Sequence, residues 1–126
     1  MNKDVTYRLG SWAASAAASD IPEDVRYEGV RSFVNWLGCA VGGAREPAVE
    51  RAIAALGQFS SNAGTAVLGR AERFDAMTTA LINGISSHVL DYDDTHLKTI
   101  IHPAGPVASA ALGVAETTGA TGDEFL

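Results

Sequence analysis

Residues 83–106 read NGISSHVLDYDDTHLKTIIHPAGP, and this stretch determines how the two predicted helices on either side of it are joined. It holds all three histidines of the protein, His88, His96 and His102, together with three aspartates in four positions, Asp91, Asp93 and Asp94. Carboxylates and imidazoles placed side by side are the groups that general acid–base catalysis requires. A solvated acidic loop is the alternative interpretation, but apolar residues on both sides of the cluster favour a position close to a core.

The composition predicts a folded, soluble, cytoplasmic protein. Hydrophobic residues make up 47% of the 126 residues and charged residues 19%, which excludes a disordered chain. The net charge of -6 argues against nucleic acid as a partner, because phosphate contacts need a basic surface. No window approaches the ~20 apolar residues of a membrane span, and no signal peptide is predicted. The single cysteine, Cys39, fits a reducing compartment, and we expect it to be a buried, unreactive thiol.

Apolar residues at helical spacing run through the chain, and we expect an all-α fold. The predicted helices span residues 4–18, about 22–41, 46–59, 72–91 and 103–118, with Gly119 as a cap and a sixth helix starting at 121. Residues 60–64 have the composition of a turn. Residues 65–69 fit a short strand or an extended connector, and the sequence nearby offers no obvious strand partner.

Each predicted helix has an expected inward face. For the second helix, we expect Asp20 as the N-cap, Pro22 in the first turn and Gly42–Gly43 at the end. The expected inward residues are Val5, Leu9, Trp12 and Ala16 in the first helix; Val30, Phe33, Val34, Leu37 and Val41 in the second; Val49, Ile53 and Leu56 in the third; and Phe74, Met77, Leu81, Ile85 and Val89 in the fourth.

The residues that follow the fourth helix allow several roles. Thr95 is placed either to donate a hydrogen bond to a substrate carboxylate or to cap a turn. His102 precedes the fifth helix, whose free N–H groups favour an anion, so it is either beside a bound carboxylate or an ordinary loop histidine. Lys98 either pairs with the aspartates or binds substrate. A metal site is a competitor, but neither H-E-x-x-H nor a calcium-loop spacing is present, and we expect no metal and no cofactor.

The same residues resemble the signature of a known family. Asn83–Gly84, HVLDYDDTH at 88–96, His102–Pro103, Pro106 and Ala110–Ala111–Leu112 with Glu116 resemble the MmgE/PrpD family, as do IPEDV at 21–25, LGCAVGG at 37–43 and TAVLG at 65–69. That family includes 2-methylcitrate dehydratase, cis-aconitate decarboxylase and an iminodisuccinate epimerase. The resemblance covers nearly the whole chain.

The resemblance implies a bundle-like part of a large, mostly helical domain, followed in the full protein by a smaller α/β lid domain, with a homodimer as the usual assembly. Because family members are several times longer, residues 1–126 would be the N-terminal portion of the helical domain. The family's remaining active-site groups, and most of its basic substrate-binding residues, would then lie beyond Leu126, and the 126 residues alone would be inactive.

The activity that the resemblance implies is cofactor-free removal of a proton next to a carboxylate, followed by loss of water or CO2 or by reprotonation. Asp91, Thr95 and His102 match active-site positions. We assign Asp91 and His102 to acid–base work and Thr95 to substrate positioning, and we expect His96, Lys98 and Asp94 to bind substrate. The resulting hypothesis is a lyase for a small di- or tricarboxylate such as 2-methylcitrate. The alternative is a non-catalytic helical module whose Asp/His loop binds a divalent cation or a partner protein.

Overall fold

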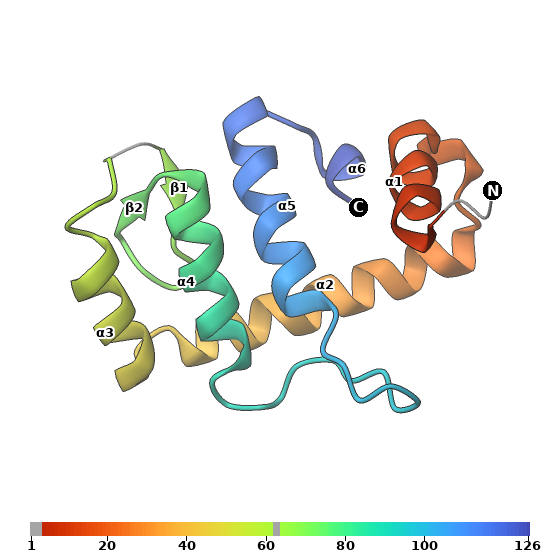
Figure 1. Ribbon diagram of the computed structural model, residues 1–126. Helices are drawn as coiled ribbons and strands as arrows, with labels where there is room; N and C mark the ends of the chain where they lie inside the picture. The colour runs from red at the N-terminus through yellow and green to blue at the C-terminus, as the bar shows by residue number, and fades with distance from the viewer. Residues whose placement is uncertain (1–3, 62–63) are drawn as a thin grey trace.

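A computed structural model describes residues 4–61 and 64–126 of the chain (Figure 1). In chain order its elements are α1 (Val5–Ser15), the 3-10 turn η1 (Ala18–Asp20), α2 (Glu23–Gly43), α3 (Pro47–Leu56), β1 (Thr65–Ala66), β2 (Arg73–Phe74), α4 (Ala76–His88), α5 (Ala104–Thr118) and α6 (Gly122–Phe125). The expected all-α fold is confirmed, since the two strands form one short antiparallel pair. The turn predicted over residues 60–64 includes residues 62–63, which lie outside the described ranges.

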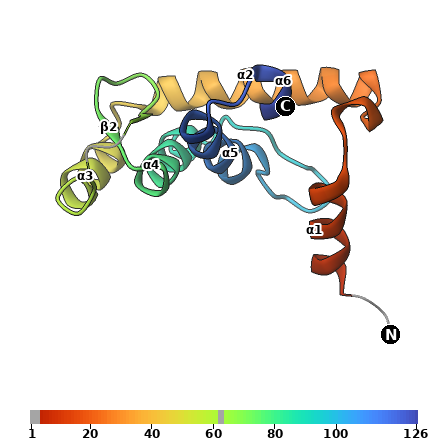
Figure 2. The same ribbon diagram turned by 90° about the horizontal axis from the view of Figure 1, so that it is seen from above.

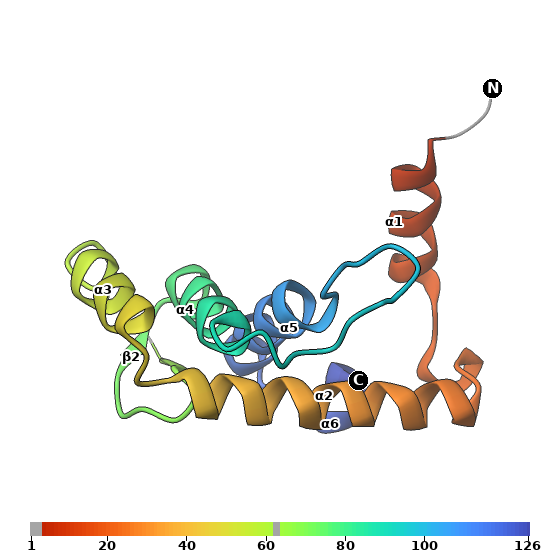
Figure 3. The same ribbon diagram turned by 90° about the horizontal axis from the view of Figure 1, so that it is seen from below.

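The long helix α2 is the element on which the others are arranged. Helices α3, α4 and α5 lie side by side across it, as the views from above and below both show (Figures 2 and 3). Helix α4 packs against both α2 and α5. Helix α1 projects away from the N-terminal end of α2, and none of its residues is buried, so its predicted inward face is exposed. Across the described ranges, no helix combines the length and apolar character needed to cross a membrane.

The start of α2 differs from the prediction. Pro22 is the N-cap residue, and Asp20 instead accepts a hydrogen bond from the N–H of Ala17 inside the preceding 3-10 turn. Asp20 was therefore the wrong cap. Glu23 and Asp24 do lie in the first turn, where carboxylates interact favourably with the helix dipole.

The buried face of α2 matches the prediction only in part, since Phe33 and Leu37 are half-buried and Phe33 packs against Trp36. The buried residues are Trp36, Ala40 and Gly43, whereas Val30, Val34 and Val41 are exposed. Small residues occupy the buried face of α2 where α4 approaches it closely. A side chain on Gly43 would overlap the carbonyl oxygen of Ser86 and lie 2.7 Å from Val89 Cγ1. The indole N–H of Trp36 donates to Ser109 Oγ at 3.2 Å, which ties α2 to α5.

Helix α4 starts later than predicted, because residues 73–74 form β2. Thr65 pairs with Phe74 and Ala66 with Arg73, so the strand partner of residues 65–66 lies in the stretch predicted to be helical. Asp75 then caps α4 by accepting from the N–H groups of Met77 and Thr78 at 3.1 and 3.0 Å. The hairpin of β1 and β2 thus includes residues 73–74, which were predicted to lie in the first turn of the helix.

The fully buried positions of α4 are mostly polar, although two of the predicted inward residues, Phe74 and Ile85, pack against the core as expected. Met77 and Leu81 are exposed, and the residues buried in their place are Thr79, Ile82, Asn83, Ser86 and Ser87. Asn83 satisfies its amide by donating to Ala66 O at 3.1 Å and accepting from Leu68 N at 3.0 Å. Because such polar groups are satisfied, they pack inside without a large penalty.

Other predictions are confirmed. The inward residues of α3 pack as expected: Val49 is buried with Val67 and Ile82, and Ile53 and Leu56 pack against them. Helix α5 ends at Gly119, whose φ of 71° is the left-handed conformation typical of a glycine cap. Thr121 caps α6 together with Glu124.

Candidate active site

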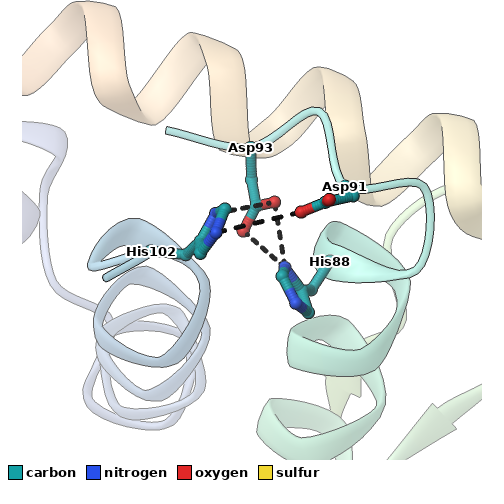
Figure 4. A group of neighbouring side chains, drawn as sticks. All are labelled: His88, Asp91, Asp93 and His102. Carbon is teal, nitrogen blue, oxygen red and sulfur yellow. Dashed lines mark hydrogen bonds and ion pairs between the residues drawn. The ribbon is translucent and has the colours of Figure 1, made fainter. Parts of the chain in front are cut away.

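Four side chains converge where α4 ends and α5 begins (Figure 4). His88 is the last residue of α4, Asp91 and Asp93 lie in the following loop, and His102 stands two residues before α5. Their nitrogen and oxygen atoms, one from each residue, all lie within 4.8 Å of one another. The structure therefore brings Asp91 and His102, both predicted from the sequence, into one cluster with His88 and Asp93.

Asp93 is the centre of this cluster. Its side chain is fully buried, and its two carboxylate oxygens lie 3.0 and 3.1 Å from Nδ1 of His88. Nδ1 of His102 lies 3.3 Å from the same carboxylate. A buried carboxylate needs such partners, because burial of an unpaired charge is costly. Asp93 therefore orients both imidazole rings, whose centroids are 4.8 Å apart.

Asp91 lies at the exposed side of the cluster. Its φ of 55° is left-handed, a conformation in which aspartate is enriched relative to most residues, and its N–H donates to His88 O at 2.9 Å. This turn directs the carboxylate back toward His102, with Asp91 Oδ1 3.8 Å from His102 Nε2. The Asp91 side chain is 78% exposed, so it remains accessible to a ligand.

The other predicted site residues lie outside the cluster. Asp94 Oδ1 accepts from the N–H of Ala104 at 3.1 Å and so occupies the N-terminus of α5, where we expected an anion to bind. The hydroxyl of Thr95 donates to the carbonyl oxygen of Asp93 at 3.4 Å. The exposed His96 contacts Thr99 Oγ1 at 2.6 Å. Lys98 is exposed, and within residues 4–61 and 64–126 it forms no ion pair with the aspartates.

An apolar pocket of about 710 Å³ lies between α4 and α5, beside the two histidines. It is lined by Ala80, Leu81, Gly84, Ile85, His88, Val89, His102, Gly105 and Pro106. The imidazoles of His88 and His102 are the polar side chains among these lining residues. This volume is within the range of sites for small molecules.

Comparison with known proteins identifies the family. Residues 7–126 match the MmgE/PrpD N-terminal domain. The chain belongs to the MmgE/PrpD family. It is 28% identical over 112 residues to cis-aconitate decarboxylase of Aspergillus terreus and 26% identical over 113 residues to a cis-aconitate decarboxylase-like protein of Aspergillus oryzae.

These alignments cover 89% and 90% of the chain but 23% of each relative, so the chain spans less than a quarter of the length of the curated relatives it matches. No solved structure matches it. The family match includes every residue of the cluster, so in this protein the MmgE/PrpD N-terminal domain supplies His88, Asp91, Asp93 and His102.

The surroundings of Cys39 disfavour reactivity of its thiol in this MmgE/PrpD domain. It is half-buried, and burial, reinforced by the nearby negative charges of Asp93 and Asp94, raises the pKa of its thiol. Because the thiolate is the nucleophile, a raised pKa disfavours reactivity. This agrees with the expectation from the sequence.

The sequence assigned no role to His88 or Asp93 in the site. The five-residue spacing of these two residues was visible, but it brings the side chains together only because α4 ends at His88 and the chain turns at Asp91. A helix that continued through residue 91, as predicted, would have placed them differently.

Proposed function

We propose that the complete gene product is a lyase that removes a proton next to a carboxylate of a small di- or tricarboxylate and then releases water or CO2. The observation that carries this proposal is the Asp91–His102 pair, 3.8 Å apart, beside a pocket of about 710 Å³. Family membership and the two relatives named for cis-aconitate decarboxylation support a lyase. As the resemblance implies, the reaction uses no cofactor, and the protein works as a homodimer.

Asp91 and His102 divide the proton transfers between them. In a dehydration, one of the pair takes the proton from the carbon next to the carboxylate, and the electron pair of that C–H bond forms the new double bond. The other donates a proton to the departing hydroxyl, which leaves as water. In a decarboxylation, the C–C bond to the departing carboxylate breaks and CO2 leaves. The carbon keeps the electron pair of that bond and then takes a proton from Asp91 or His102. Both routes are general acid–base catalysis by accessible groups of the kind that the cluster presents.

Asp93 serves this chemistry by holding the imidazoles. Its buried carboxylate bonds Nδ1 of His88 and lies 3.3 Å from Nδ1 of His102, so that Nε2 of His102 is on the side of Asp91. A fixed orientation of this kind favours proton transfer, because little reorganisation is left for the reaction itself.

The loop residues are proposed to contact substrate. The hydroxyl of Thr95, the imidazole of His96 and the ammonium group of Lys98 are exposed on the loop between α4 and α5 and are suited to hydrogen bonds with carboxylates. For Asp94, which bonds the N–H of Ala104, we propose that it holds the loop in place for substrate binding. The remaining positive charge for a tri- or dicarboxylate would come from other parts of the complete protein.

The test is an assay of the purified complete gene product with 2-methylcitrate, citrate and cis-aconitate in the presence of EDTA. Absorbance of the alkene follows dehydration, and CO2 release follows decarboxylation. We expect turnover of at least one substrate that is unaffected by EDTA. Absence of turnover with all three substrates would contradict the proposal.

A further inference from the structure

The cluster at the end of α4 also has the donor set of a metal site. His88 and His102 offer imidazole nitrogen, and Asp91 and Asp93 offer carboxylate oxygen, with all four donor atoms within 4.8 Å of one another. Zinc bound tetrahedrally at about 2.0–2.1 Å holds its ligands roughly 3.3–3.5 Å apart. Around Asp93 Oδ1, Nδ1 of His88 lies at 3.0 Å and Nδ1 of His102 at 3.3 Å, close to that spacing, while Asp91 Oδ1 lies 3.8 Å from the other ring nitrogen of His102, Nε2.

The charges in the cluster are not balanced by a permanent cation. In the part of the chain that the structure describes, the ion-pair partners of the fully buried Asp93 carboxylate are the imidazoles of His88 and His102, and neither Lys nor Arg pairs with it. A buried carboxylate without a compensating charge is costly. Nδ1 of His102 is buried and makes no hydrogen bond among the described residues. A dication would balance the two carboxylates and could take this nitrogen as a ligand.

We propose that His88, Asp91, Asp93 and His102 bind a divalent transition-metal ion, with Zn²⁺ as the preferred ion, and that this ion inhibits the enzyme. Two nitrogen and two oxygen donors suit Zn²⁺, whereas Mg²⁺ and Ca²⁺ prefer oxygen ligands alone. The inhibitory part rests on the proposed function, because an ion held by the Asp91 carboxylate and the His102 imidazole would occupy the two groups that transfer protons. The binding part does not depend on it.

The four residues differ in how they would close on the ion. The Asp93 side chain is fully buried and that of His102 is 25% exposed, so these two form the fixed half of the site. The side chains of Asp91 and His88 are 78% and 54% exposed, and they have room to move inward, as tetrahedral ligation requires where the donor atoms are up to 4.8 Å apart. When the ion binds, the imidazole nitrogen that ligates it must be unprotonated.

Calorimetric titration of the complete gene product, stripped of metal with EDTA and dialysed, tests the binding. We expect a one-to-one complex with Zn²⁺ and no comparable heat with Mg²⁺. The His88→Ala variant should bind Zn²⁺ at least about 100-fold more weakly, because even the loss of a group that supports a ligand costs 10–100-fold. The matched control is His96→Ala, which removes an exposed histidine of the same loop that lies outside the cluster and should leave Zn²⁺ affinity unchanged.

The outcomes separate this inference from the proposed function. Equal Zn²⁺ affinity in wild type and His88→Ala, or no Zn²⁺ binding by the wild type, would overturn the metal site. Turnover of the metal-free enzyme, assayed without EDTA, that persists when added Zn²⁺ saturates the site would overturn inhibition while leaving the lyase proposal intact. Zn²⁺ binding that His88→Ala abolishes, in a protein that turns over none of the three substrates, would support the site and contradict the lyase.

Discussion

The close approach of α2 to α4 positions the end of α4. The substitution Gly43→Ala, which adds one methyl group at this contact, tests this arrangement. Gly43 is the last residue of α2 and is buried. In Gly43→Ala, the new Cβ would lie 2.7 Å from Val89 Cγ1 and overlap the carbonyl oxygen of Ser86, whereas real Cβ contacts essentially never fall under 3.0 Å. Because the Ser86 carbonyl belongs to the backbone of α4, the two helices must separate locally to accept the substitution.

The size of the effect follows from this overlap. Inserting a methyl group into a packed site costs about 1–3 kcal/mol, and we expect the upper part of this range because a backbone atom cannot rotate away. Replacing glycine by alanine within a helix stabilises the folded protein by at most about 1 kcal/mol, which offsets part of this cost. The net prediction for Gly43→Ala is a loss of about 2 kcal/mol in the free energy of unfolding.

The matched control is Gly38→Ala in the same helix. A Cβ at residue 38 meets no atom within 4 Å, so this variant should gain up to about 1 kcal/mol. Urea unfolding of the complete gene product, followed by far-UV circular dichroism, compares the two midpoints. Gly43→Ala should also lower turnover, since Ser86 and Val89 flank His88. If Gly43→Ala were as stable as Gly38→Ala, the described contact between α2 and α4 would be wrong.

Two further predictions concern stability. Ser109→Ala should lower the free energy of unfolding by about 1–3 kcal/mol, because it leaves the buried indole N–H of Trp36 without an acceptor, and urea midpoints measure this. A hydrogen bond from Arg70 lowers the pKa of Glu72 from 4.5 to about 2, so its stabilising contribution should be complete above pH 4.5 and lost as the pH falls toward 2. Glu72→Gln should therefore be less stable at neutral pH and lose less stability on acidification; an unchanged acid dependence of the urea midpoint would contradict this.

The helices were predictable from the sequence, whereas their buried faces were predictable only in part. Periodicity and capping residues located α5, Gly119 and the start of α6, because these signals are local. The inward face of α2 depends on how closely α4 approaches, and that favours Ala40 and Gly43 over the larger valines. Likewise, Asn83 is buried because β1 and the residue after it supply hydrogen-bond partners, which no pattern within α4 reveals.

The candidate site was predictable in part for the same reason. Asp91 and His102 stood out through their types and their place beside a helix start. The pairing of His88 with Asp93 required the helix to end at His88 and the chain to turn with a positive φ at Asp91. A prediction that extended α4 to residue 91 excluded that geometry.

Asp91 is the acid–base group on which the proposed reaction depends most directly, and turnover by Asp91→Asn is the measurement that tests this role. The substitution keeps the size of the side chain and removes its ability to exchange a proton. We predict a loss of about 10²–10⁴-fold in turnover on the substrate that the wild type accepts, with circular dichroism and melting temperature unchanged. Turnover close to that of the wild type would contradict the assignment of Asp91 and the mechanism built on it.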